Sequence, residues 1–139
     1  MYLLDTNVVS EQRKIGAGTA DPGVTAWSES LVSESAYLSV ITVLELEKGV
    51  LLMERRDPRQ GAMLRAWLED QVLLEFEGRI LPVDLRVARR SASLHVPDPW
   101  DDRDALIAAT ALVHGMTVVT RNVSHFKRTP VPIFNPWQA

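Results

Sequence analysis

Short apolar segments that fit β-strands alternate along this chain with longer segments whose apolar residues recur at helical spacing. Strands are expected at residues 2–4, 36–41, 80–83, 116–120 and 132–134. Helices are expected at residues 8–14, 24–32, 58–77, 85–94 and 102–114, and from Thr42 through Leu51. Parallel strands need a crossover connection, usually a helix, whereas antiparallel strands can be joined by a tight turn. The alternation therefore predicts a three-layer α/β/α sandwich around a mainly parallel central sheet.

Length and composition narrow the class of protein. A chain of 139 residues has room for one domain, which is expected to span residues 1–139. The chain has no cysteine, which excludes disulfides, thiolate zinc sites and a cysteine nucleophile. No apolar stretch is long enough for a signal peptide or a membrane span, so a cytoplasmic location without membrane contact is expected.

The charge is unevenly distributed. The net charge of -3 does not suggest a protein that is basic overall, as many nucleic-acid binders are. Residues 105–139 nevertheless contain no acid, and they carry Arg121, Lys127 and Arg128. The cations are twelve arginines and three lysines, and the planar fork of arginine matches phosphate oxygens well. A local surface for a phosphate backbone is one interpretation, and ordinary solvated arginines are the other.

The predicted topology places four polar residues, Asp5, Glu45, Asp104 and Asn122, at the carboxyl edge of the sheet. Each has a structural explanation alone: an Asx turn at Asp5, a capping box of Glu45 with Thr42, a helix dipole at Asp104 and a turn at Asn122. Together they form a cluster of oxygen ligands, which suits a hard divalent cation such as Mg²⁺ or Mn²⁺. A metal-dependent active site is the interpretation that covers all four.

Several other chemistries lack their defining residues. A haloacid-dehalogenase-type phosphatase needs a second acid two residues after the first, where this chain has Asn7. The sequence has neither a nucleophile elbow nor a Walker-type phosphate loop. A small-molecule phosphatase of another kind remains a possible alternative, which turnover of a generic phosphomonoester would reveal.

Five motifs in order resemble those of a known family. They are Leu3-Leu4-Asp5-Thr6-Asn7, Glu45-Leu46-x-x-Gly49, Asp104-Ala105-Leu106-Ile107-Ala108-Ala109-Thr110-Ala111, Val119-Thr120-Arg121-Asn122 followed by Phe126, and Asn135-Pro136-Trp137. This series resembles PIN-domain proteins, specifically the VapC and FitB type toxins of bacterial toxin–antitoxin pairs. The resemblance implies an endoribonuclease dependent on Mg²⁺ or Mn²⁺, usually a homodimer, that a cognate antitoxin protein holds inactive.

The resemblance also implies roles for individual residues. Asp5, Glu45 and Asp104 match the three core acids that hold the metal. The fourth acidic position departs from the family pattern, because this chain has Asn122 or His125 where relatives often have an acid. Supporting roles in orienting water or substrate, in the outer shell of the metal and in phosphate contact are implied for Thr6, Asn7, Thr120, Asp101 and Arg121.

The expected reaction is metal-assisted hydrolysis of RNA phosphodiester bonds that leaves a 5′ phosphate and a 3′ hydroxyl. The alternative is a PIN-like module that has lost catalysis through its fourth position and acts by binding RNA or a protein. Trp100 is expected either to pack in the core or to stack on an unpaired base. The segment 50–53 is expected either to pack in the core or to receive a dimer partner or an antitoxin helix.

Overall fold

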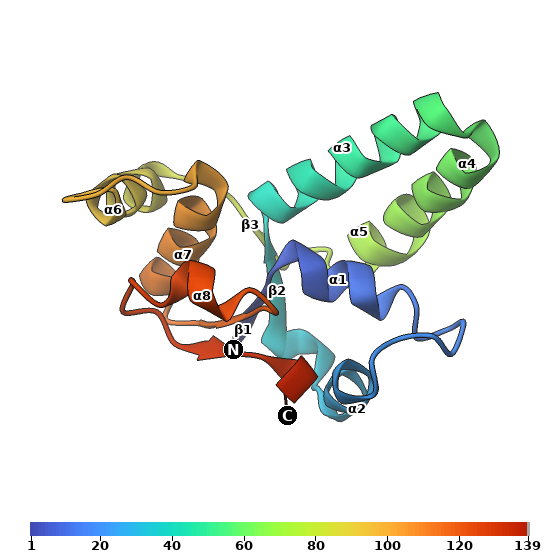
Figure 1. Cartoon of the computed structure of the whole chain (residues 1–139), viewed down its shortest axis with the longest axis horizontal. Coiled ribbons are helices and arrows are strands. Elements are labelled where there is room, and N and C mark those ends of the chain that lie inside the picture. The colour runs from blue at the N-terminus through green and yellow to red at the C-terminus, as the bar shows by residue number, and fades with distance from the viewer. Residues whose placement is uncertain (139) are drawn as a thin grey trace.

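The structure is a computed structural model that describes residues 1–138. Its centre is a five-stranded sheet in the order β3-β2-β1-β4-β5, and every neighbouring pair is parallel (Figure 1). The strands are β1 (Tyr2–Leu4), β2 (Ala36–Ser39), β3 (Ile80–Leu81), β4 (Thr117–Val119) and β5 (Ile133–Phe134). The predicted parallel α/β fold is therefore confirmed.

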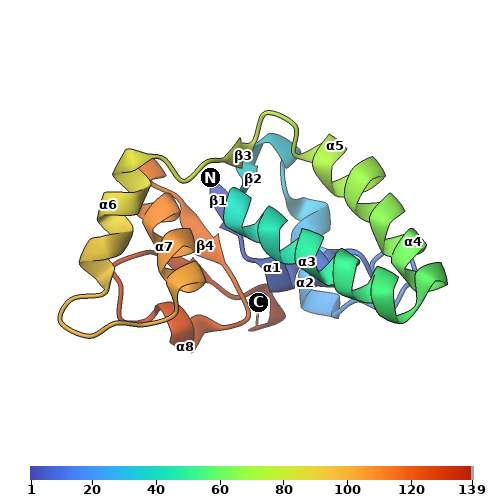
Figure 2. The ribbon, with the colours of Figure 1, turned by 90° about the horizontal axis from the view of Figure 1, so that it is seen from above.

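Helices cover both faces of the sheet (Figures 1 and 2). The α-helices are α1 (Thr6–Gln12), α2 (Pro22–Ser30), α3 (Val40–Arg56), α4 (Pro58–Trp67), α5 (Leu73–Glu75), α6 (Leu85–Leu94), α7 (Asp102–His114) and α8 (Val123–Phe126). The shorter turns are η1 (Ser33–Ser35), η2 (Leu68–Val72) and η3 (Pro136–Gln138). Helices α1 to α5 pack on one face and α6 to α8 on the other, which gives three layers.

Alternate residues of each strand enter two separate cores. Leu4 and Val119 pack with Val8, Val50 and Leu68 in the core under α1 to α5. On the opposite face, Leu3 and Val118 pack with residues of α7 and α8. Successive strand side chains point to opposite faces of a sheet, so central strands that are buried on both sides read as continuous apolar runs.

Three expected boundaries near the sheet edge are wrong. The strand predicted to reach residue 41 ends at Ser39, whose side chain accepts from the Ile41 N–H at 3.0 Å and caps α3. Helix α3 therefore begins before Thr42, and Thr42 and Glu45 do not form a capping box. The turn expected after Asp5 is already helix α1, because the Asp5 carboxylate caps it and satisfies a free N–H group.

Most of the remaining elements follow the prediction, but α8 was not expected, and α3 continues beyond Leu51 to Arg56. The helix expected at 58–77 is observed as α4, the π-helical turn η2 and α5 in direct succession. Helix α7 is buried over most of its length and ends at Gly115 in the left-handed conformation, with φ of 68°. Among the residues that the structure describes, no helix has both the length and the apolar composition to cross a membrane.

Candidate active site

The sheet topology creates a crevice at the carboxyl ends of its central strands. From β1 the chain moves to β2 and β3 on one side, and later returns to place β4 on the other side of β1. Ligands bind at such a switch point in open parallel sheets, because the loops diverge there. A crevice of about 380 Å³ lies at this edge, and it is lined by Asp5, Thr6, Asn7, Glu45, Asp101, Arg103, Asp104, Asn122 and His125.

Asp5 is the most buried of the acids, with 6% of its surface exposed. Its Oδ1 accepts from the Thr6 N–H at 2.8 Å, and its Oδ2 accepts from Thr120 Oγ1 at 2.8 Å and from Asn7 Nδ2 at 3.2 Å. Burial raises the pKa of this carboxyl group above its ordinary value, although these hydrogen bonds act in the opposite direction. The carboxylate is therefore fixed in orientation and costly to ionise.

Glu45 enters the crevice from the second turn of α3. The Thr6 hydroxyl donates to its Oε1 at 2.7 Å, and Arg103 Nη1 lies 3.6 Å from its Oε2. Thr6 follows the Asp5 cap directly, so one short segment after β1 positions both carboxylates. The contact supports the predicted place of Glu45 in the site.

Asp104 enters from the first turn of α7, with its Oδ2 at 3.1 Å from His125 Nδ1. Burial raises the pKa of Asp104, and repulsion by the nearby carboxylates of Asp101 and Asp5 raises it further. Asp101 also caps α7, since its Oδ1 accepts from the Arg103 and Asp104 N–H groups at 2.9 and 3.0 Å. The Asp104 carboxylate is thus repelled by two neighbouring carboxylates.

The other predicted residues divide into two groups. Asn7, which lines the crevice, and Thr120 both donate to Asp5 Oδ2. Asn122 also lines the crevice, and its N–H donates to Thr120 Oγ1 at 3.0 Å. Arg121 does not line the crevice, since its guanidinium lies over the Trp137 ring at 5.4 Å. A phosphate contact by Arg121 stays a prediction.

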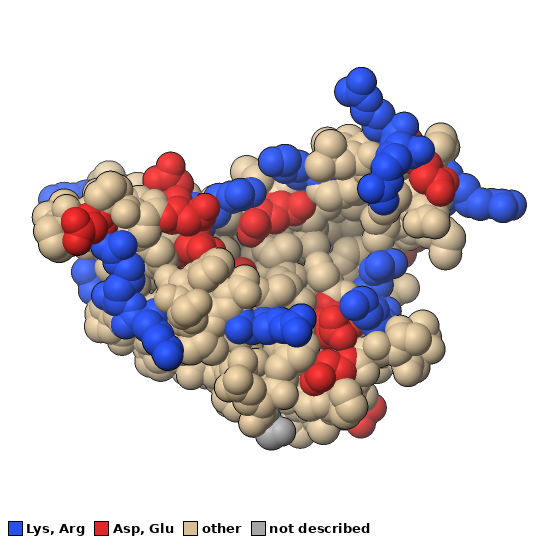
Figure 3. All heavy atoms as spheres, in the orientation of Figure 1, with Lys and Arg blue, Asp and Glu red and all other residues tan. Residues whose placement is uncertain are grey.

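The motif analysis did not predict that two of the acids have basic partners. Arg103 faces Glu45, and His125 faces Asp104, where only the absence of an acid at position 125 had been noted. In Figure 3, acidic and basic side chains gather together over the region where the first turns of α3 and α7 approach each other. The sequence held no signal for the Arg103 contact, because Arg103 pairs with Glu45 of α3 and not with the acids beside it in α7.

The donor set fits a hard divalent cation. Asp5, Glu45 and Asp104 offer only carboxylate oxygens, and the mutual repulsion that raises the pKa of Asp104 is what a cation would relieve. Within residues 1–138, no three acidic or histidine side chains converge closely enough to hold an ion as they stand. Each of the three is instead turned to its own partner, so ion binding requires side-chain rotations of Glu45 or Asp104.

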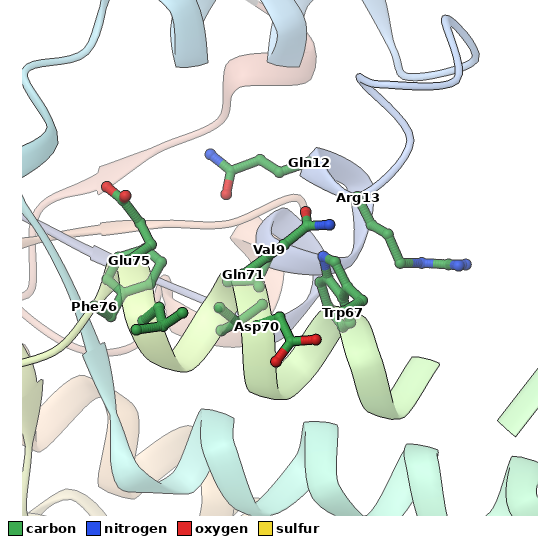
Figure 4. Close-up of a pocket in the computed structure, with 10 residues that line it drawn as sticks. Val9, Gln12, Arg13, Trp67, Asp70, Gln71, Glu75 and Phe76 are labelled. Atoms are coloured by element: carbon green, nitrogen blue, oxygen red, sulfur yellow. The ribbon is translucent and has the colours of Figure 1, made fainter. Parts of the chain in front are cut away.

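A separate hollow of about 530 Å³ lies between α1 and the succession α4, η2 and α5 (Figure 4). Trp67 and Phe76 form part of its wall, and the Arg13 guanidinium lies 5.8 Å from the Trp67 ring. The hollow shares no lining residue with the carboxylate crevice.

Comparison with known proteins gives the class that this fold and crevice define. The sequence model of the PIN domain matches residues 2–132, and the chain belongs to the PIN-domain family. Within that family it is of the FitB and VapC toxin type, as its relatives indicate. Toxin FitB of Neisseria gonorrhoeae is 40% identical over 99% of both chains, and the VapC ribonuclease Y4jK of Sinorhizobium fredii is 38% identical over 99% of both chains.

The structural comparison agrees with the sequence comparison. The crystal structure of FitAcB from Neisseria gonorrhoeae contains a chain that matches the whole of this chain over its own full length, with 40% sequence identity and a TM-score of 0.90. At this level of similarity the path of the backbone around the crevice is shared. The resemblance expected from the five sequence motifs is confirmed.

Proposed function

We propose that the chain is a metal-dependent endoribonuclease, the toxin of a toxin–antitoxin pair, that hydrolyses phosphodiester bonds in RNA. One observation carries the proposal: Asp5, Glu45 and Asp104 come from three distant parts of the chain and line the same crevice at the switch point of the sheet. The ribonuclease name of the Sinorhizobium relative supports the choice of RNA as substrate.

The residues of the crevice have different roles in the proposed reaction. Asp5, Glu45 and Asp104 would hold Mg²⁺ or Mn²⁺, which when bound activates water and neutralises charge on a scissile phosphate. Thr120 and Asn7 fix the orientation of Asp5, and Thr6 fixes that of Glu45 through its 2.7 Å hydrogen bond. Arg103 supplies positive charge at the rim of an otherwise acidic crevice, where it can meet an incoming phosphate.

Two surfaces are available for partners. The exposed face of α3 carries Leu44, Leu51 and Leu52, each more than half exposed, and we assign it to a second copy of the chain in a homodimer. The hollow between α1 and α5 we assign to a segment of the antitoxin, because its aromatic wall fits an amphipathic helix or an extended apolar segment. The solved structures of relatives include toxin–antitoxin complexes, which supports this pairing.

The deciding experiment is incubation of purified protein with structured RNA and Mn²⁺. We expect cleavage that stops when a chelator is added, 5′ phosphate ends on the products, and no cleavage by the Asp5→Asn variant. Binding of RNA without any cleavage would favour the alternative of a catalytically silent module. Turnover of a phosphomonoester with intact RNA would overturn the assignment of substrate.

A further inference from the structure

A second hollow adjoins the carboxylate crevice on the side of α8. It measures about 340 Å³ and is lined by Trp100, Asp101, Asp104, Ser124, His125 and Arg128. Asp101, Asp104 and His125 line both spaces, so the two are continuous. A substrate that places its phosphate beside Asp104 must therefore extend a neighbouring group towards Trp100 and Arg128.

The wall of the hollow that would face this group consists of two planar groups, a guanidinium and an indole, one over the other. The Arg128 guanidinium lies over the Trp100 indole with 5.5 Å between the guanidinium carbon and the ring centroid. Trp100 meets the buried Phe126 ring edge-on, at 6.2 Å between centroids and an interplanar angle of 88°. The Arg128 guanidinium also donates to the Asp98 carbonyl oxygen, and this hydrogen bond restricts its position. Trp100 can therefore both pack in the core and offer a stacking surface, because its contacts with Phe126 and with Arg128 differ in geometry.

We propose that the Trp100–Arg128 pair is a stacking platform for an unpaired nucleobase next to the scissile phosphate. The inference rests on the proposed ribonuclease function. Bases in RNA stack on aromatic rings and on arginine planes wherever the strand is unpaired. A base within a duplex is already stacked on both faces, so a platform of this kind selects single strands, loops and bulges.

The hollow has one arginine, Arg128, against two carboxylates, so its charges do not favour a second phosphate. Asp101 and Asp104 line the same space, and two carboxylates repel a phosphate group at close range. A nucleobase is neutral, and its amino groups can donate to a carboxylate that faces it. Ser124 adds a hydroxyl on the α8 side of the hollow.

The test compares a short single-stranded RNA with the same RNA lacking one base beside the cleaved bond. Wild-type protein with Mn²⁺ first locates the cleavage site, and RNAs with an abasic nucleotide at each flanking position follow. We expect one abasic position to reduce kcat/KM by about ten- to a hundredfold, the usual contribution of a single stacked base. The same cleavage site in a duplex should react more slowly.

Trp100→Leu should cleave intact RNA more slowly and should no longer distinguish it from the abasic RNA. Leucine keeps an apolar contact with Phe126, and Arg128→Lys, which keeps the charge and loses the plane, should behave in the same way. Trp27→Leu is the matched control, because Trp27 packs against Tyr2 and Phe134 away from this hollow. It should retain the full abasic penalty.

The outcomes separate the inference from the proposed function. If the wild-type protein cleaves RNA but both platform variants keep its abasic penalty, or if the wild-type protein shows no penalty, the platform is refuted and the ribonuclease stands. If no RNA is cleaved, the ribonuclease proposal fails, and the affinities of the intact and abasic RNAs, measured by fluorescence anisotropy, test the platform alone.

Discussion

At the scale of single residues, the fold disfavours the charged form of two of the three core acids, Asp5 and Asp104. Burial raises the pKa of Asp5 and of Asp104, so ionising either one costs folding free energy. The native state consequently binds a proton at Asp104 more tightly than the unfolded chain does. The contribution of Asp104 to the stability of the metal-free protein should therefore be lost as the pH rises above the ordinary aspartate pKa of about 3.9.

Asp104→Asn should abolish cleavage and should stabilise the metal-free protein at neutral pH, because the amide removes the buried charge. Thermal melting in chelator between pH 4 and pH 8 measures this, and the stability gain should shrink at the acid end, where the wild-type carboxyl is protonated. Asp102→Asn is the control at the same helix end, since the Asp102 side chain is 91% exposed. If Asp104→Asn were no more stable than the wild type at neutral pH, burial and repulsion would not destabilise the charged form of Asp104.

Arg103→Ala should have opposite effects on metal and on RNA. Without the guanidinium beside Glu45, Mn²⁺ affinity measured by calorimetry should increase by about two- to fivefold, the range of a partly exposed ion pair. RNA affinity should fall, and the slope of its logarithm against that of the salt concentration should decrease by about 0.7, as for one lost contact to a single strand.

The control for this variant is Arg59→Ala at the start of α4, far from the crevice, which should change neither quantity. Unchanged Mn²⁺ affinity in Arg103→Ala would show that Arg103 does not restrain Glu45.

Sequence patterns found the positions of the acids but not their partners. Asp5 could be predicted because it directly follows the first strand, whereas Glu45 and Asp104, which lie in α3 and α7, could be predicted only from the order of the motifs. The pairing of Asp104 with His125 could not, because it depends on the rotamers of residues in α7 and in the short helix α8. Whether Asn122 contributes to catalysis stays a prediction for the same reason, although it lines the crevice.

At the scale of elements, α3 and α4 form a hairpin whose closest approach depends on one glycine. A Cβ atom at Gly61 would lie 2.4 Å from Glu54 Cα, which is backbone and cannot rotate away. Arg65 of α4 reaches the same stretch of α3, with Nη2 at 2.6 Å from Glu47 Oε2 and 3.3 Å from Glu54 Oε1. The packing of the two helices thus depends on the close backbone contact at Gly61 and on the ion pairs of Arg65 with α3.

Gly61→Ala should destabilise the protein by about 1 to 3 kcal/mol, because the helices must separate to admit the methyl group. Gly49→Ala is the matched variant in α3, where no heavy atom would lie within 4 Å of the new Cβ, and it should stabilise by about 0.5 to 1 kcal/mol. Urea denaturation gives both values. Similar effects of the two variants would show that the helices do not touch at Gly61.

Element types could be predicted well, whereas boundaries and helix regularity could not. The helical period of residues 58–77 predicted the element. The π-helical turn η2 within it could not be predicted, because it occurs where Leu68 and Val72 both pack in the core, which depends on tertiary structure. The onset of α3 was misplaced by three residues for a related reason. By residue type, Thr42 is as suitable an N-cap as Ser39. Ser39 takes this position because the pairing of β2 with β3 ends there.

At the scale of the whole molecule, the exposed leucines of α3 should determine the oligomeric state. Leu52→Glu places a charge at the centre of the proposed dimer face, where Leu52 is 60% exposed in the single chain. Light scattering should give a dimer mass for the wild type and a monomer mass for this variant. Leu85→Glu on α6, where Leu85 is 73% exposed, should leave the mass unchanged. A wild-type monomer would remove the dimer from the proposal.

The fold class could be predicted from the alternation of elements, but the strand order could not. Any order of five parallel strands satisfies the same alternation, and the observed order depends on pairings between distant segments. The carboxylate crevice depends on that order, since it opens where β4 lies beside β1.

The place of β1 at the centre of the sheet also decides when the protein becomes active during its synthesis. Tyr2–Leu4 is among the first segments to leave the ribosome, yet its partner β4 and the Thr120 hydroxyl that orients Asp5 are made more than a hundred residues later. Until then Asp5 lacks the hydrogen bond from Thr120 and has only the local contacts of Thr6 and Asn7. We therefore expect a chain whose translation stops before residue 120 to be inactive.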